Sequence, residues 1–261
     1  MGELGLKNYL EEMKQYLADA DSLCRFWTAW SLALLSNDSQ GGDSKALTIL
    51  VSIAESDLPY RAKALQLAIR QMDAPAANAW WNKLAQDAKH IRNAIIAAGA
   101  WGDPANIPWL MERMKVPDLA RVCGEAFTMI TGVDIAYQDL DIGKPEDFTA
   151  GPTENPEDEN VEIDPDENLP WPHPELIAKW WNLHQGRFQR GARYLLGTTI
   201  SMDWCQQVLC KGRQRQRGAA ALELALARVG TPLFNVAAPG FRQMCQLGLT
   251  RKDFQRPLPD R

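Results

Sequence analysis

Residues 89–114 read KHIRNAIIAAGAWGDPANIPWLMERM, and this stretch decides the fold class. Apolar residues on both sides of its middle follow the 3.6-residue period of an α-helix. In the middle stand Gly102, which suits the end of a helix, Asp103, which suits a cap, and Pro104, which suits a first helical turn. The stretch therefore predicts two consecutive helices joined by a tight turn.

A related pattern recurs along the chain as a turn residue, an arginine and alanines at helical spacing. The arginines that mark it are Arg25, Arg61, Arg92, Arg121 and Arg217. The first four are separated by 36, 31 and 29 residues, enough for two helices of about 12 residues and two short turns. Small residues such as Ala64 and Ala97 would let neighbouring helices approach closely. A single pair of helices cannot bury its apolar face alone, so each pair must stack on the next one.

These features predict an all-α protein, an α-solenoid of HEAT-like helix pairs that is interrupted by a long acidic, proline-rich loop. We expect N-terminal helical repeats at 1–132, the loop at 133–172 and C-terminal helical repeats at 173–261. Residues 151–172 hold five prolines and eight acids, a composition that disfavours both a helix and a core. No sustained period-2 pattern predicts a sheet.

Charge is distributed unevenly around a formal net charge of -5. Residues 153–175 carry nine acids and no Lys or Arg, whereas residues 176–261 carry fourteen Lys or Arg against four acids. The net negative charge argues against a general attraction to nucleic acid or to anionic lipid. The asymmetry favours a partner whose surface is itself polarised.

Sequence signatures of catalysis and of cofactor binding are missing. The five cysteines and three histidines show no metal-ligand spacing, and the odd number of thiols indicates a reducing cytoplasm. No nucleotide-binding or hydrolase motif occurs, and no apolar run of about 18 residues predicts a membrane span. We expect a cytoplasmic protein without enzymatic activity or cofactor, with a carboxylate dyad assembled in three dimensions as the enzymatic alternative.

The candidate partner-binding residues come from the charged segments and from two tryptophan pairs. On a helix, Arg213, Arg215 and Arg217 would lie about 200° apart in succession. We expect Arg217 to have a structural role. We expect Arg213 and Arg215 to form ion pairs with the loop, or to bind an acidic protein or nucleic acid. The full set is Arg213, Arg215, Arg187, Arg190, Trp81, Trp181, Glu157, Asp158 and Glu159.

Two of these assignments have alternatives. Oxygen ligands alternate at Asp158, Asn160, Glu162 and Asp164, but the glycine and the closing glutamate of an EF-hand are absent, so a solvated loop or one folded onto the basic C-terminal segment is favoured over calcium. Neighbours on a helix point about 100° apart. The two pairs are Trp80-Trp81 and Trp180-Trp181. In each pair one tryptophan would thus face a partner, or else both pack in the interior of the protein.

Several motifs resemble those of a bacterial family associated with type VI secretion gene clusters. They are Gly191-Ala-Arg-Tyr-Leu-Leu-Gly197, residues 212–225, Pro232-Leu-Phe-Asn-Val-Ala-Ala-Pro239, Arg242-Gln243, residues 164–172, Trp180-Trp181, Ala97-Ala-Gly99, Gly102-Asp-Pro104 and Ile107-Pro-Trp-Leu110. The resemblance covers about residues 20–245. This chain departs from the family in a shorter N-terminal region and in His173, where an acid would be expected.

The resemblance implies HEAT-like repeats and a role in secretion, without assigned catalytic residues. We therefore expect an immunity protein that binds and neutralises an effector toxin of the same gene cluster. The alternatives are an adaptor or chaperone that loads an effector, an enzyme with a site on a concave face, and a nucleic-acid-binding protein that uses residues 187–217.

Overall fold

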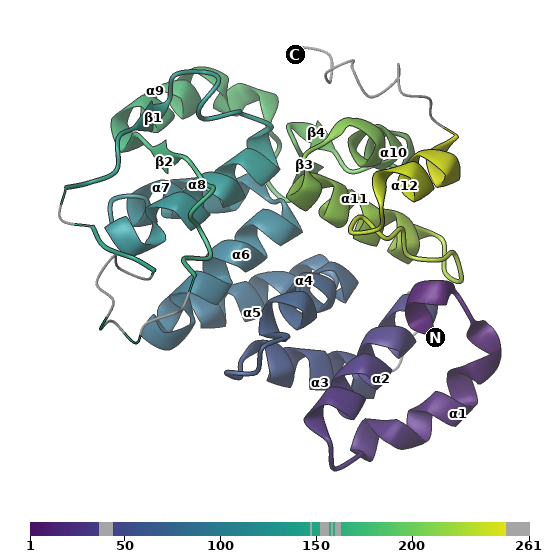
Figure 1. Cartoon of the computed structure of the whole chain (residues 1–261). Coiled ribbons are helices and arrows are strands. Elements are labelled where there is room, and N and C mark those ends of the chain that lie inside the picture. The colour runs from purple at the N-terminus through teal and green to yellow at the C-terminus, as the bar shows by residue number, and fades with distance from the viewer. Residues whose placement is uncertain (37–43, 147, 152–156, 158, 160–162, 249–261) are drawn as a thin grey trace. The chain divides into compact units, whose positions relative to one another are not determined.

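The computed structural model describes residues 1–36, 44–146, 148–151, 157, 159 and 163–248 (Figure 1). Helices dominate this part of the chain, which confirms the all-α class. The α-helices are α1 (Leu10–Lys14), α2 (Ser22–Leu35), α3 (Ser44–Ala54), α4 (Arg61–Gln71), α5 (Ala74–Gln86), α6 (Ile91–Trp101), α7 (Ile107–Arg113), α8 (Pro117–Thr131), α9 (Pro174–His184), α10 (Met202–Lys211), α11 (Gln214–Ala227) and α12 (Gly240–Leu247). The 3-10 helices are η1 (Gly2–Leu4), η2 (Lys7–Tyr9), η3 (Gln15–Ala18), η5 (Ala88–His90), η6 (Pro104–Asn106) and η7 (Gln185–Arg187). The strands are β1 (Asp141–Ile142), β2 (Trp171–Pro172), β3 (Tyr194–Leu195) and β4 (Thr198–Thr199).

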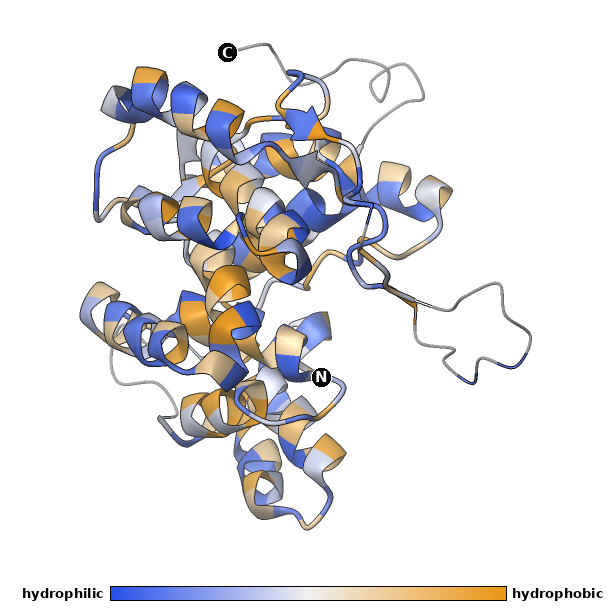
Figure 2. Cartoon of the chain, turned by 90° about the vertical axis from the view of Figure 1, so that its left-hand side faces the viewer, coloured by the Kyte–Doolittle hydropathy of each residue, from blue (hydrophilic) through white to orange (hydrophobic). Residues whose placement is uncertain are grey.

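The helices bury apolar side chains on one side and expose polar side chains on the other. Figure 2 shows hydrophobic and hydrophilic residues alternating along the helical ribbons, as amphipathic helices require. Ala64 and Ala97, which we expect between helices, are completely buried, as are Ala68 and Ala94. Their small side chains allow the close approach of helices that the sequence predicts.

The chain forms two compact units, and one of them is discontinuous in sequence. Unit 1 comprises residues 1–93 and the chain from Thr198 onward, whereas unit 2 comprises residues 94–197. The last helices of the chain thus join the first ones in one unit, and the segments expected at 1–132, 133–172 and 173–261 stay predictions. The boundary between residues 93 and 94 lies inside α6.

Within unit 1, α2 and α4 run parallel to each other. At their starts, the Tyr60 hydroxyl donates to Ser22 Oγ at 2.8 Å. At their ends, Gln71 Nε2 donates to the carbonyl oxygen of Ala33 at 2.5 Å. Both contacts join residues that are 38 positions apart, so the two helices keep one register over their whole length.

The last helices of unit 1 are tied to the first by polar contacts. Arg70 of α4 donates through Nε to a carboxylate oxygen of Glu223 in α11 at 2.9 Å. The N-terminal segment reaches the loop after α11, where the N–H of Leu233 donates to the carbonyl oxygen of Glu3 at 2.9 Å. These contacts explain why the C-terminal helices belong to the same unit as the N-terminal ones.

In unit 2, the turn predicted at Gly102-Asp103-Pro104 is confirmed. Gly102 has a positive φ of 83°, and the Asp103 carboxylate accepts from the N–H of Ala105 as the cap of η6. The same carboxylate oxygen accepts from the N–H of Gly191 at 3.0 Å. The turn therefore also anchors a segment that is almost ninety residues further along the chain.

The segment 191–197 donates hydrogen bonds to carbonyl oxygens at the C-terminal ends of α6 and α8. At the end of α6, Arg193 Nε donates to Trp101 at 2.9 Å and the N–H of Tyr194 donates to Gly102 at 2.8 Å. At the end of α8, the N–H groups of Leu196 and Gly197 donate to the carbonyls of Met129 and Ile130. The last carbonyls of a helix have no partner inside the helix, so this segment supplies their hydrogen bonds.

The acidic, proline-rich segment is helix-free in its described residues, as expected, and both of its flanks are pinned to α8. The side chain of Arg121 is 7% exposed and donates to Asp164 at 2.6 Å. Its guanidinium lies 4.6 Å from the ring centroid of Trp171 and 5.2 Å from that of Phe148. A short antiparallel pairing of β1 with β2 fixes the end of the segment.

Candidate partner-binding surface

The candidate residues are divided between the two units. Arg213 caps the N-terminus of α11 and Arg215 lies in its first turn, and both are exposed side chains of unit 1. Arg187, Arg190, Glu157 and Glu159 are exposed side chains of unit 2, and Asp158 lies outside the described residues. The expected contact of Arg213 and Arg215 with the loop therefore stays a prediction.

The two tryptophan pairs differ in how they are buried. Trp80 is 7% exposed and donates to Glu55, which leaves Trp81 as the more exposed member of its pair. Trp181 is also only 7% exposed and packs against the ring of Phe188. This burial removes Trp181 from the surface, because a side chain in the core of unit 2 has no face to offer a partner.

The turn between α10 and α11 carries a concentration of positive charge. Lys211 ends α10, Arg213 and Arg215 begin α11, and all three side chains are exposed. Within residues 198–248, exposed basic side chains outnumber exposed acidic ones by five to one. The five are Lys211, Arg213, Arg215, Arg228 and Arg242, and the exposed acid is Asp203.

The start of α11 lacks the anionic or hydroxyl cap that other helices of this chain have. Asp21, Asp73 and Ser201 accept hydrogen bonds from the first turns of α2, α5 and α10. At α11, the N–H of Arg213 donates instead to Gln216 Oε1 at 2.8 Å. Cations at a helix N-terminus oppose the helix dipole by about 0.3–1 kcal/mol each.

An exposed aromatic side chain stands on the helix that follows. Phe241 of α12 is 67% exposed, and the guanidinium of its neighbour Arg242 lies 5.8 Å from its ring centroid. Sequence reasoning missed Phe241, although its place between Gly240 and Arg242 at the start of a short helix was visible. We name Lys211, Arg213, Arg215, Phe241 and Arg242 the basic surface.

Arg217 holds α12 against α10 and α11, which confirms its expected structural role. Its Nε donates to the carbonyl oxygen of Leu209 at 2.7 Å, and its Nη2 donates to Gln243 Oε1 at 2.6 Å. Gln243 Nε2 in turn donates to the carbonyl oxygens of Val236 and Ala238. Burial lowers the pKa of Arg217 from its usual value, and these neutral oxygens solvate its charge.

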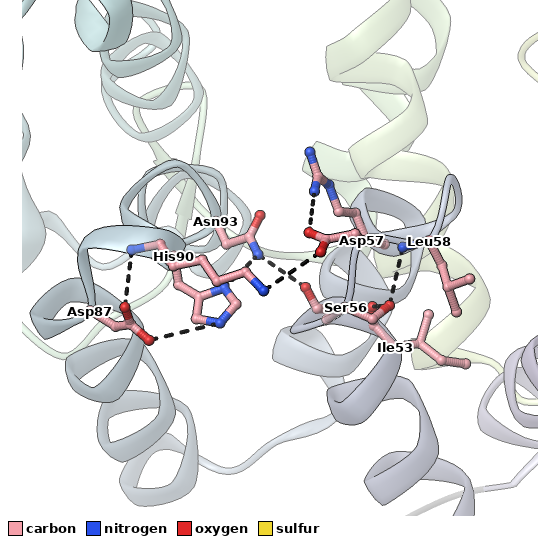
Figure 3. A network of polar contacts seen from close by, with 10 residues as sticks. Ile53, Ser56, Asp57, Leu58, Asp87, His90 and Asn93 are labelled. Carbon is pink, nitrogen blue, oxygen red and sulfur yellow. Dashed lines mark hydrogen bonds and ion pairs between the residues drawn. The ribbon is translucent and has the colours of Figure 1, made fainter.

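Polar contacts elsewhere in unit 1 connect helices that are not neighbours in the sequence (Figure 3). The carboxylate of Asp57 lies 3.6 Å from Lys89 Nζ, and the N–H of Lys89 donates to Asp87 at 3.0 Å. Asn93 Nδ2 donates to the carbonyl oxygen of Ala54 at 3.0 Å. These contacts join the end of α3 to the start of α6, so we assign them to structure.

Glu55 forms a second connection between helix pairs. Trp80 Nε1 and Lys83 Nζ each donate to its carboxylate at 2.8 Å. Burial tends to raise the pKa of Glu55, but these hydrogen bonds and the charge of Lys83 outweigh it and hold the pKa below its usual value. The ionised carboxylate is thus the form that the folded protein stabilises.

The described residues contain neither a group of three or more His, Cys, Asp or Glu side chains that could hold a metal ion nor a helix long and apolar enough to cross a membrane. The calcium ligands considered at Asp158, Asn160 and Glu162 lie outside the described residues, while Asp164 is engaged by Arg121. Comparison of the chain with protein-family models, with curated proteins and with solved structures found no match.

Proposed function

We propose that this chain is a non-enzymatic, protein-binding solenoid of HEAT-like helix pairs that works with a type VI secretion system. In this proposal it is a cytoplasmic immunity protein that binds a cognate effector toxin and neutralises it. The motif resemblance supports the link to secretion, and the parallel packing of α2 and α4 supports the helix-pair architecture. The basic surface supports the protein-binding role.

The observation that carries the proposal is the combination of charge and aromatic exposure on the basic surface. Arginine and aromatic side chains are enriched among the residues that dominate binding energies at protein interfaces. Arg213 and Arg215 are exposed at the start of α11, where their positive charge suits a partner with an acidic surface. The partner that fits is a protein with an acidic face around a pocket for Phe241.

Binding measurements with the product of the neighbouring gene test this proposal. Exchanging two cations for anions, Arg213→Glu with Arg215→Glu, should weaken the complex by at least about tenfold, mainly through a slower association rate. The matched control is Arg228→Glu, an exposed arginine just after the other end of the same helix. Arg228→Glu should bind with the affinity of the wild type. Raised salt should reduce the difference in affinity between this control and the double variant.

A toxicity assay in cells then separates inhibition from loading. Rescue of cells that express the neighbouring gene's product supports neutralisation, and loss of rescue in the Arg213→Glu, Arg215→Glu variant assigns it to the basic surface. A stable complex whose toxin stays active supports the adaptor or chaperone role instead. Absence of a complex at micromolar concentration, or tight salt-dependent binding to DNA or RNA in place of protein, would overturn the proposal.

A further inference from the structure

The helix that carries Phe241 and Arg242 is attached to unit 1 through a polar side chain. Of the eight residues of α12, all of which the structure describes, Gln243 alone is buried, with 6% of its surface exposed. A helix this short is not stable by itself in water, so its neighbours must hold it. The position of α12 therefore depends in large part on the hydrogen bonds of Gln243.

The amide of Gln243 makes three hydrogen bonds that fix its direction. Its Oε1 accepts from Arg217 Nη2 at 2.6 Å, and its Nε2 donates to the carbonyl oxygens of Val236 and Ala238 at 2.9 and 2.5 Å. An amide turned by 180° would set its NH2 group against the guanidinium and its oxygen against two carbonyl oxygens. The amide therefore fits in one direction only, and it fixes where α12 lies on its neighbours.

The same hydrogen bonds reach the start of α11. The carbonyl oxygen of Val236 also accepts from Gln214 Nε2 at 2.6 Å. Gln214 is the first residue of α11 and stands between Arg213 and Arg215 in the sequence. One carbonyl oxygen thus links α12 to the helix end that carries two cations of the basic surface.

Arg217 extends this network of hydrogen bonds to the end of α10. Its Nε donates to the carbonyl oxygen of Leu209 at 2.7 Å, two residues before Lys211. Together with the bonds of Gln243 and Val236, this bond joins α10, α11 and α12 (Figure 1). The network therefore connects the three helices on which the basic surface lies.

Loss of the Gln243 amide should open α12 without unfolding unit 1. A buried guanidinium costs free energy unless oxygen atoms solvate it. Without the Gln243 oxygen, water can solvate Arg217 on that side only when α12 moves away. This movement exposes little apolar surface, because Gln243 is the one buried residue of α12. Local opening is therefore the less costly response.

We propose that Gln243 and Arg217 are positioning residues of the basic surface. Their hydrogen bonds hold α12 where its Phe241 and Arg242 complete that surface. The inference rests on the proposed function, in which the basic surface binds an acidic protein. It adds that two buried side chains decide whether the surface is complete, although both lie beneath it.

Amide hydrogen exchange of the full chain without a partner tests the positioning. Gln243→Met keeps the length of the side chain but removes its three hydrogen bonds. The amides of α12 should exchange at least about tenfold faster, while those of α2–α4 keep their wild-type rates. The matched control is Gln246→Met, the same change at an exposed residue of the same helix, and it should leave the α12 rates unchanged. Equal α12 rates in Gln243→Met and in the wild type would overturn the proposal.

A second variant keeps the test informative if Gln243→Met fails to fold. Gln214→Met replaces an exposed side chain at the other end of the network and removes its hydrogen bond to Val236. The amides of α12 should then exchange at least about threefold faster, since one hydrogen bond of the network is lost. Wild-type rates in this variant would count against the proposal in the same way.

Binding to the product of the neighbouring gene tests whether the position of α12 matters for the partner. Gln243→Met should raise the dissociation constant about tenfold, as expected when the complete surface is present in about one molecule in ten. Phe241→Ala should also weaken binding but should not speed exchange in α12. In the double variant the two losses should combine to less than their sum, because Gln243 acts partly through Phe241. Full additivity would contradict the positioning role.

The two measurements fail separately. A wild-type chain that forms no complex at micromolar concentration would refute the proposed function, while faster α12 exchange in Gln243→Met would still support the positioning of α12. A Gln243→Met variant with open α12 and wild-type affinity would leave the proposed function standing and would overturn the role of Gln243 in it.

Discussion

Arg70 and Glu223 form a buried ion pair, with Nε and a carboxylate oxygen 2.9 Å apart, although 153 residues separate them in the sequence. Their side chains are 2% and 8% exposed. Arg70 also donates to the carbonyl oxygen of Gln66 at 2.7 Å. The pair therefore closes a unit whose two segments lie on either side of residues 94–197.

Breaking this pair should destabilise the protein severely. Glu223→Gln leaves a buried guanidinium without its counter-charge, which we expect to lower the free energy of unfolding by about 3–5 kcal/mol. The double change Arg70→Met with Glu223→Leu should recover most of the loss, because no buried charge remains. Urea unfolding of both variants, with the exposed Glu12→Gln as control, checks this; equal losses in the single and double variants would contradict it.

The turn at Gly102 should tolerate no side chain. Its φ of 83° disfavours other residues, and a Cβ atom there would lie 2.2 Å from the carbonyl oxygen of Tyr194. We expect Gly102→Ala to lower the melting temperature through a loss of about 2–4 kcal/mol. Gly143→Ala is the control, because a Cβ at Gly143 meets nothing within 4 Å. A Gly102→Ala variant as stable as this control would refute the packing described.

Arg121 should determine whether the end of the acidic segment stays attached to α8. Arg121→Met removes the guanidinium that Asp164 and Trp171 share, and so takes its positive charge away from the partly buried Asp164 carboxylate. Amide hydrogen exchange at residues 164–172 should become faster, since exchange reports local opening. Glu159→Gln, an exposed change in the same segment, should leave these rates unchanged.

Glu55 should make stability depend on pH in the acidic range. Its pKa in the folded protein lies below the usual value of 4.5, so the ionised form binds Lys83 and Trp80 more favourably than water does. This stabilisation is complete above the unfolded-state pKa and is lost as the pH falls through the lower folded-state pKa. The difference in unfolding free energy between the wild type and Glu55→Gln should therefore be largest near pH 7 and shrink below about pH 4. A difference that stays constant from pH 7 to pH 3 would contradict this assignment.

Local features of the fold were predictable from the sequence because they depend on neighbouring residues. The turn at Gly102, the helices on both sides of it and the helix-free segment before Pro174 all follow from periodicity, caps and prolines. The structural role of Arg217 was also predictable, since it stands at the arginine position of the repeated pattern. Arg213 and Arg215 are exposed, and their role in binding a partner stays a prediction.

The remaining features depend on contacts between distant residues. Phe241 could not be recognised as exposed before the position of α12 was known, and Trp181 could not be recognised as buried before Phe188 packed against it. The motif at 191–197 gave no sign that it would cap α6 and α8, because those helices end far from it in the sequence.

The sequence by itself determined that the chain is mostly helical, where the turn at Gly102 lies, and where charge of each sign is concentrated. Only the tertiary structure decided that the chain's last helices complete the unit begun by its first. It also decided that Arg121 binds the acidic segment and that Leu23 and Trp27 stay exposed. The physical reason is that helix formation is governed by interactions within about one turn, whereas burial and ion pairing depend on which distant segments meet.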